Sequence, residues 1–154
     1  MGRRVVLLTA ALLIGAGAHA GTSNVLQVVH ARREHFKRLG RTAKSLRDQI
    51  GRSRPNWNLV VSDTNEIERL AQDLPNWFPA GSGQARGIKT KARAIIWSKP
   101  QEFARAAHRL SNSAAILAQA ASRHDLAGVR LRARAVGQAC GSCHHRFRSH
   151  SNWW

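Results

Sequence analysis

Apolar residues recur at the intervals of an α-helix in four separate stretches of this sequence. The stretches run from Val25 to Ile50, from Val60 to Leu74, from Phe103 to Ala121 and from Leu126 to Phe147. Residues three and four positions apart share one face of a helix, so each stretch predicts a helix with a narrow apolar face. Joined by two short turns and one long loop, they predict an all-α fold, an antiparallel four-helix bundle.

Capping and breaking residues indicate where the first two helices begin and end. Ser23 or Asn24 is expected to cap the first helix, because short polar side chains accept hydrogen bonds from the free amides there. The second helix begins either after Asn56 or at a later capping box, Asp63-x-x-Glu66. Pro75 ends it, since proline cannot continue the hydrogen-bonded ladder.

The stretch from Pro75 to Trp97 contains two prolines and three glycines and has little periodicity. It predicts a long crossing loop, and its aromatic anchors are Trp77, Phe78 and Trp97. The capping box Ser98-x-x-Gln101, with Pro100 in the first turn, predicts the start of the third helix. Asp125 is expected to cap the fourth.

The N-terminus has the composition of a secretory signal. Arg3 and Arg4 precede an apolar run from Val5 to Ile14, and Ala18-His19-Ala20 supplies a small-residue cleavage site. We therefore expect residues 1–20 to be removed and residues 21–154 to form one exported domain, in a bacterial periplasm. The apolar run is too short to span a bilayer, and we expect no transmembrane segment.

Both cysteines of the chain lie in one motif, Cys140-Gly141-Ser142-Cys143-His144. On a helix the two sulfurs and the imidazole project from one face, so two thioether bonds and an iron ligand could reach one flat porphyrin. The C-x-x-C-H order is typical of covalent attachment of a c-type haem. A zinc site needs four ligands around the metal, and a redox dithiol belongs to a βαβ unit, so both remain weaker alternatives.

One charged residue, Arg32, lies on the apolar face of the first helix. It either extends past the core to solvent or faces an anionic group held inside the bundle. Gly137 and Gly141 lie in the fourth helix, where each costs about 1 kcal/mol relative to alanine. Two such residues make sense where a ring approaches the backbone closely.

The chain is strongly basic. Removing Arg3 and Arg4 from its 25 basic residues leaves 23 against 8 acidic ones, a formal net charge of +15. Such a charge favours an acidic protein partner or anionic membrane heads, and the alternative is a solvated basic face that only keeps the protein soluble. Nucleic acid is not expected as a partner, because the chain is exported and has no recognition motif.

Several pieces of the sequence resemble the cytochrome c-prime family, the class II c-type cytochromes, over about Val25 to Arg148. The strongest piece runs from Val136-Gly137 through the cysteine motif to Phe147-Arg148. The weaker pieces are Arg32-x-x-x-Phe36 with Leu39-Gly40, Leu74-Pro75 and Ile96-Trp97-Ser98. The resemblance implies a four-helix bundle with haem bonded near the end of its last helix.

The resemblance also implies roles for single residues. Cys140 and Cys143 would hold one haem c, and His144 would be the iron ligand. Arg32 matches an arginine found near a haem propionate, and Arg148 matches a basic residue beside the ligating histidine. Phe36 matches the position over the other face of the iron, which is methionine in low-spin relatives.

The only methionine is Met1, which leaves with the signal, so a histidine–methionine ligand pair is excluded. His35 and His30 lie off the helix face that bears Phe36, and we expect surface histidines there. We expect a single-electron carrier and not an enzyme. The alternative is a protein that binds nitric oxide or carbon monoxide at a five-coordinate iron, and a haem peroxidase is a weaker hypothesis.

The expected partner of the carrier is an acidic redox protein. A basic surface of the last helix would steer it, through Arg130, Arg132, Arg134, Arg146 and Arg148. A homodimer remains open.

Overall fold

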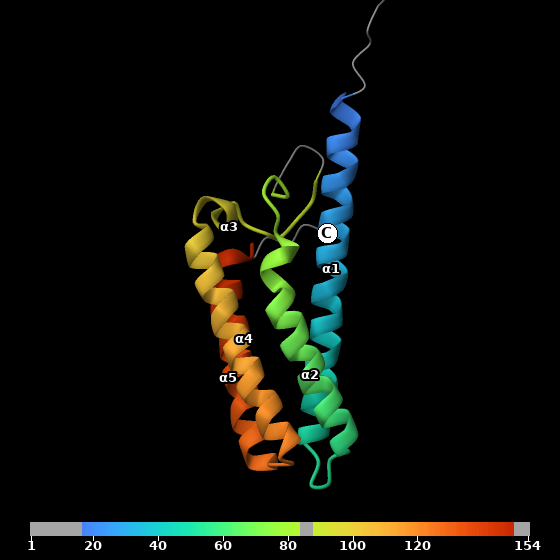
Figure 1. Ribbon diagram of the computed structural model, residues 1–154, viewed down its shortest axis with the longest axis vertical. Coiled ribbons are helices and arrows are strands. Elements are labelled where there is room, and N and C mark those ends of the chain that lie inside the picture. Colours follow the sequence, from blue (N-terminus) through green and yellow to red (C-terminus); the bar gives the residue numbers. More distant parts are fainter. Residues whose placement is uncertain (1–16, 84–87, 150–154) are drawn as a thin grey trace, which may run out of the picture.

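The computed structural model describes residues 17–83 and 88–149, and four long helices dominate it (Figure 1). They are α1 (Gly17–Ile50), α2 (Trp57–Asp73), α4 (Pro100–Ser122) and α5 (Leu126–Phe147). A 3-10 turn, η1 (Leu74–Trp77), and a one-turn helix, α3 (Ile95–Ser98), lie between α2 and α4. The antiparallel four-helix bundle is confirmed, and the described part of the chain contains no β-strand.

Helix α4 lies at the centre of the packing, between α2 and α5, while α1 packs on α2. Six of its nine buried residues are alanines, and such small side chains let neighbouring helices approach closely. Among the most deeply buried side chains are Val60, Ile67, Leu117 and Val129, all from positions predicted to face inward. None of the described helices is long and apolar enough to cross a membrane.

Two of the predicted helix caps are confirmed. The side chain of Asn56 accepts a 3.3 Å hydrogen bond from the amide of Leu59 and begins α2. The side chain of Asp125 accepts a 2.9 Å hydrogen bond from the amide of Gly128 and begins α5. The later capping box therefore does not start the second helix.

Two other predicted helix starts are wrong. Ser98 ends the short helix α3, and α4 begins after Lys99, whose side chain makes no capping bond. Pro100 starts α4 because its fixed backbone angle suits a first helical turn. In the uncleaved chain, Ser23 and Asn24 lie within α1, which already begins at Gly17.

The long loop is tied to the end of α5. The amide of Arg93 donates to the carbonyl of Phe147 at 3.0 Å, and the amide of Ser149 donates to the carbonyl of Lys91 at 2.7 Å. These bonds flank an isolated antiparallel bridge between Ala92 and Arg148. The loop is therefore held against the C-terminal end of α5 by backbone hydrogen bonds.

Candidate haem site

Cys140 and Cys143 lie on the inner face of α5, partly buried against the core, as the spacing predicted. His144 follows them one position on and is more exposed. Within residues 17–83 and 88–149, no three histidine, cysteine or acidic side chains converge as a metal-binding group. The three side chains are therefore arranged along one helix face rather than around a point.

The electrostatic surroundings keep these groups neutral. Burial raises the pKa of the Cys140 and Cys143 thiols, and nearby Arg109 partly offsets the rise at Cys143. Burial, followed by the charge of Arg148, lowers the pKa of His144. A neutral imidazole is the form that ligates a metal.

The face of α5 beside this motif is open. A Cβ atom added at Gly137 or Gly141 would meet nothing within 4 Å. Helices α1 and α5 contact each other much less than α1 contacts α2 or α4 contacts α5. A flat group bonded to Cys140 and Cys143 therefore has room against the backbone of α5, on the side that α1 leaves uncovered.

Arg32 is 4% exposed and has no acidic partner among the described residues. Its Nη1 donates to the backbone and side-chain oxygens of Ser82, at 3.3 and 3.4 Å, and its Nη2 donates to Oγ1 of Thr90 at 3.0 Å. Its guanidinium lies over the rings of Phe78 and Trp97.

Burial, then repulsion from Arg33, lowers the pKa of Arg32 to about 10. A buried charge is costly when no opposite charge accompanies it. The site therefore fits an anionic group, which is the second of the two alternatives that the sequence left open.

Aromatic rings surround Phe36. Its ring meets Trp77 edge-on at 5.1 Å and Phe78 at 6.1 Å. His35 packs against Trp77 at 4.8 Å, and its Nδ1 is buried without a hydrogen-bond partner. His35 is thus half-buried rather than on the surface, contrary to the expectation from the sequence.

Arg148 is the last predicted site residue. Its backbone amide donates to the carbonyl of His144 at 3.0 Å and ends α5, and its side chain is exposed. Sequence reasoning missed Ser82 and Thr90, because hydroxyls in an aperiodic loop carry no signal of a partner 50 or more residues away.

The predicted basic surface is only partly free. Arg130 donates through Nε to the carbonyl of Ile50 at 2.8 Å and through Nη2 to that of Arg52 at 3.1 Å. Arg146 forms a 2.8 Å ion pair with Glu102. These two side chains thus fasten α5 to the α1–α2 turn and to α4.

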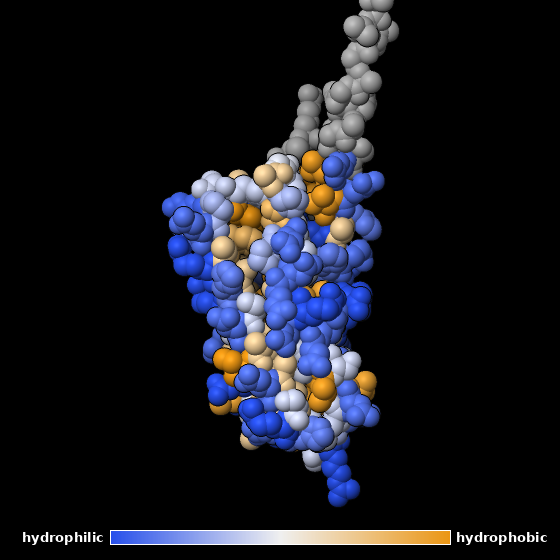
Figure 2. Space-filling view, viewed as in Figure 1, coloured by the Kyte–Doolittle hydropathy of each residue, from blue (hydrophilic) through white to orange (hydrophobic). Residues whose placement is uncertain are grey.

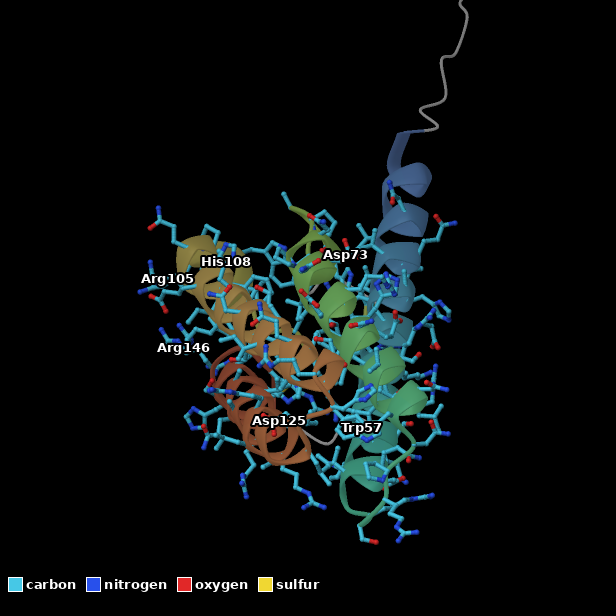
Figure 3. All side chains as sticks on the ribbon, turned by 60° about the horizontal axis from the view of Figure 1, so that its bottom comes forward. Trp57, Asp73, Arg105, His108, Asp125 and Arg146 are labelled. Carbon is cyan, nitrogen blue, oxygen red and sulfur yellow. The ribbon has the colours of Figure 1, made fainter. Side chains whose placement is uncertain are left out.

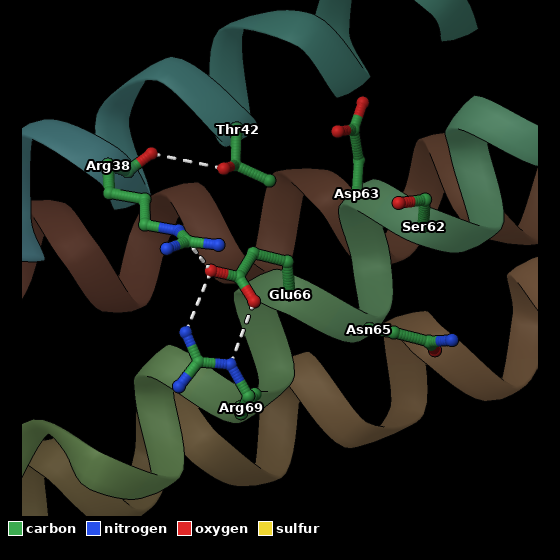
Figure 4. A pocket seen from close by; sticks show the side chains of 7 residues that line it. All are labelled: Arg38, Thr42, Ser62, Asp63, Asn65, Glu66 and Arg69. Carbon is green, nitrogen blue, oxygen red and sulfur yellow. Dashed lines mark hydrogen bonds and ion pairs between the residues drawn. The ribbon is translucent and has the colours of Figure 1, made fainter.

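A polar groove on the outside of α1 and α2 contains none of the predicted site residues (Figure 4). Glu66 lies in it between Arg38 and Arg69, each of which forms an ion pair with it. Asp63 lies nearby, and its Oδ2 is buried without a hydrogen-bond partner. The groove is separate from the site on α5.

A four-helix bundle with a C-x-x-C-H motif on the inner face of its last helix, and a buried arginine on its first, defines a bundle-type haem c protein. A family model described as Cytochrome C' matches residues 27–148. The chain belongs to the cytochrome c' family.

Individual relatives agree with this assignment. Cytochrome c' of Pararhodospirillum photometricum is 33% identical over 121 residues, which cover 78% of this chain and 94% of that protein. Cytochrome c' of Thermochromatium tepidum has the same fold, with a TM-score of 0.74 at 19% identity, over 81% of this chain and 96% of that one. A ferrous variant of cytochrome c' from Alcaligenes xylosoxidans with bound NO aligns with a TM-score of 0.72 at 18% identity, over 80% and 94% of the two chains.

Proposed function

We propose that the mature protein, residues 21–154, is an exported, periplasmic cytochrome that carries single electrons. Residues 1–20 would be its signal peptide; most of them lie outside the described residues. When bound, the haem supplies one-electron chemistry between Fe(III) and Fe(II). The protein's contribution is to anchor the group, to ligate it and to control its surroundings.

In this proposal Cys140 and Cys143 hold the haem through thioether bonds, and His144 ligates the iron. Arg32 faces a propionate, and Arg148 lies beside His144. The observation that carries the proposal is the burial of Arg32 with no acidic partner among residues 17–83 and 88–149. A haem, with its two carboxylates, supplies the missing negative charge.

The aromatic side chains around Phe36 favour electron transfer over catalysis. Phenyl and indole rings exclude water and neither donate nor accept protons, and His35 turns its ring against Trp77. No acid–base pair accompanies Phe36 among its described ring contacts. This environment suits a cofactor that changes its charge without changing its bonds.

Gas binding is the second candidate function. No methionine remains after the signal is removed, and Phe36 cannot donate to iron, so one side of the haem would lack a protein ligand. The relative from Alcaligenes xylosoxidans with bound NO makes the same chemistry reasonable here. The same haem would serve either function.

Acid–acetone extraction of the purified protein tests covalent attachment. The chain should keep its colour, and Cys140→Ser or Cys143→Ser should retain at most one thioether, whereas Ser142→Ala should behave as wild type. Free extraction of the haem from the wild-type protein would refute the proposal. Spectra of the ferric, ferrous and carbon-monoxide-treated forms then distinguish a carrier whose iron does not bind carbon monoxide from a gas binder.

A further inference from the structure

Acidic residues are distributed unevenly over the bundle. Six of the eight lie on α1 and α2, and only Glu102 and Asp125 lie in the rest of the chain. Three of these six, Glu34, Asp48 and Glu66, form ion pairs with Lys37, Arg38, Lys44 and Arg69. On α4 and α5, Glu102 is paired with Arg146 and Lys99, and Asp125 caps a helix.

Several arginines on α4, on α5 and in the turn between them are exposed and have no acidic partner among the described residues. Arg105 and Arg109 lie one turn apart on α4, Arg123 ends that helix, and Arg132 lies on α5. Figure 3 shows Arg105 and Arg146 on the same side of the molecule. We call these four residues, with Ile116 and Leu131, the arginine face.

The two aliphatic residues lie among these charges. Ile116 is 45% exposed and Leu131 is 54% exposed. The ion pair between Glu102 and Arg146 joins the two antiparallel helices α4 and α5. Ile116 on α4 and Arg132 on α5 are the same number of residues away from this pair. They therefore lie at the same height along the axis of the bundle. Figure 2 shows the outer side of α4 as mainly hydrophilic, with hydrophobic residues near the α4–α5 turn.

The arginine face lies on the pair of helices that includes the candidate haem site. Arg105 and Arg109 lie on α4, which packs against α5, the helix of Cys140 and Cys143. Electron transfer needs a short path between cofactors, and a surface on these two helices provides one.

We propose that the arginine face is the docking site for an acidic redox protein, and this inference rests on the proposed function. Arginine forms bidentate pairs with carboxylates and is enriched in interfaces, and small aliphatic contacts suit a brief encounter. Neither α4 nor α5 exposes a tryptophan or phenylalanine side chain, whereas a membrane-binding face typically carries one or both. A protein partner therefore fits this face better than a lipid surface.

A plant-type [2Fe–2S] ferredoxin, an acidic one-electron donor, serves as the probe. We expect the combined change Arg109→Glu and Arg132→Glu to slow its reduction of the ferric protein by about tenfold or more at low salt. The matched control, Arg41→Glu with Arg54→Glu on exposed positions of α1 and its turn, removes the same charge and should slow it far less. Leu131→Ser should slow the ferredoxin reaction but leave oxidation by hexacyanoferrate(III) unchanged.

Equal losses in both charge-reversal pairs would overturn the docking site, because only net charge would then matter. The combined change Arg109→Glu and Arg132→Glu could instead abolish binding of the protein to phosphatidylglycerol vesicles and leave the ferredoxin rate unchanged. That result would also overturn the docking site, in favour of a lipid surface. Failure of the wild-type protein to exchange electrons with either reagent would instead refute the proposed function.

Discussion

Arg32 and Thr90, 58 residues apart in the chain, are joined by a 3.0 Å hydrogen bond from Nη2 to Oγ1. The bond fixes the guanidinium of α1 to the loop that leads to α3. Arg32 has further N–H groups besides those that Thr90 and Ser82 use, so it can hold an anion without releasing the loop. The pair thus positions a charge inside the bundle.

Replacing Thr90 with valine should destabilise the haem-loaded protein by about 1–2 kcal/mol, since a hydrogen bond to a charged group is lost. Thr42→Val is the control, because Thr42 donates only to the carbonyl of Arg38 on its own helix and should cost much less. Guanidinium chloride unfolding measures both. Equal losses would mean that Thr90 does not position Arg32.

Replacing Phe36 with alanine should speed carbon monoxide binding to the ferrous protein by about tenfold or more, because the ring and its contacts with Trp77 no longer block the iron. Stopped-flow absorbance measures the rate. Phe36→Met should produce a low-spin, six-coordinate haem. A bis-histidine paramagnetic resonance signal in the wild-type protein would contradict this prediction and would identify His35 or His30 as a ligand.

Burial raises the pKa of Asp63, and a hydrogen bond from Ser45 only partly offsets the rise. The folded state therefore holds the proton of Asp63 more tightly than the unfolded state, and stability falls as pH rises from the unfolded to the folded pKa. Asp63→Asn should stabilise the protein at pH 7 by about 0.5 kcal/mol, a modest effect because solvent screens the side chain. The gain should vanish below both pKa values.

Asp48→Asn is the control for Asp63→Asn, because the pKa of Asp48 is shifted in the opposite direction. Its hydrogen bond with Lys44 lowers its pKa, so its contribution is present at neutral pH and disappears as pH falls through the folded pKa. Thermal unfolding between pH 3 and 7 measures both variants. A stabilising Asp48→Asn at pH 7 would invalidate the argument.

His124 occupies the left-handed backbone region, with φ of 54°, and stacks on Trp57 at 4.7 Å. Its replacement by alanine loses the stack and keeps the strain, whereas glycine adopts this conformation freely. The glycine variant should therefore be more stable than the alanine variant by about 1 kcal/mol. The reverse order in urea unfolding would show that the turn changes its conformation.

The sequence predicted features that depend on nearby residues. The inner face of α5, including Cys140 and Cys143, follows from helical spacing, and the caps at Asn56 and Asp125 need a partner only three residues away. The prediction that the capping box at Ser98 begins the third long helix was wrong. That pattern lies just before Pro100, whose fixed backbone angle begins α4.

Long-range contacts could not be predicted. Arg32 stood out as a charge on an apolar face, but nothing in the sequence indicated Ser82 or Thr90 as its acceptors. The arginine face depends on which arginines find acidic partners, as Arg146 does with Glu102, and that is decided only when α4 and α5 pack together. The roles of Arg148 and Phe36 toward haem stay predictions.

Residues 88–93 form a strap between the two walls of the candidate site, through Thr90 to Arg32 on α1 and through Lys91 and Arg93 to the end of α5. Since α1 and α5 touch each other so little, we expect this strap to contribute to the distance between them at this end of the bundle. Insertion or deletion of one residue there would change the gap while leaving every ligand and every helix intact. Variation in the length of one loop is thus a simple evolutionary route to changing the surroundings of the haem iron.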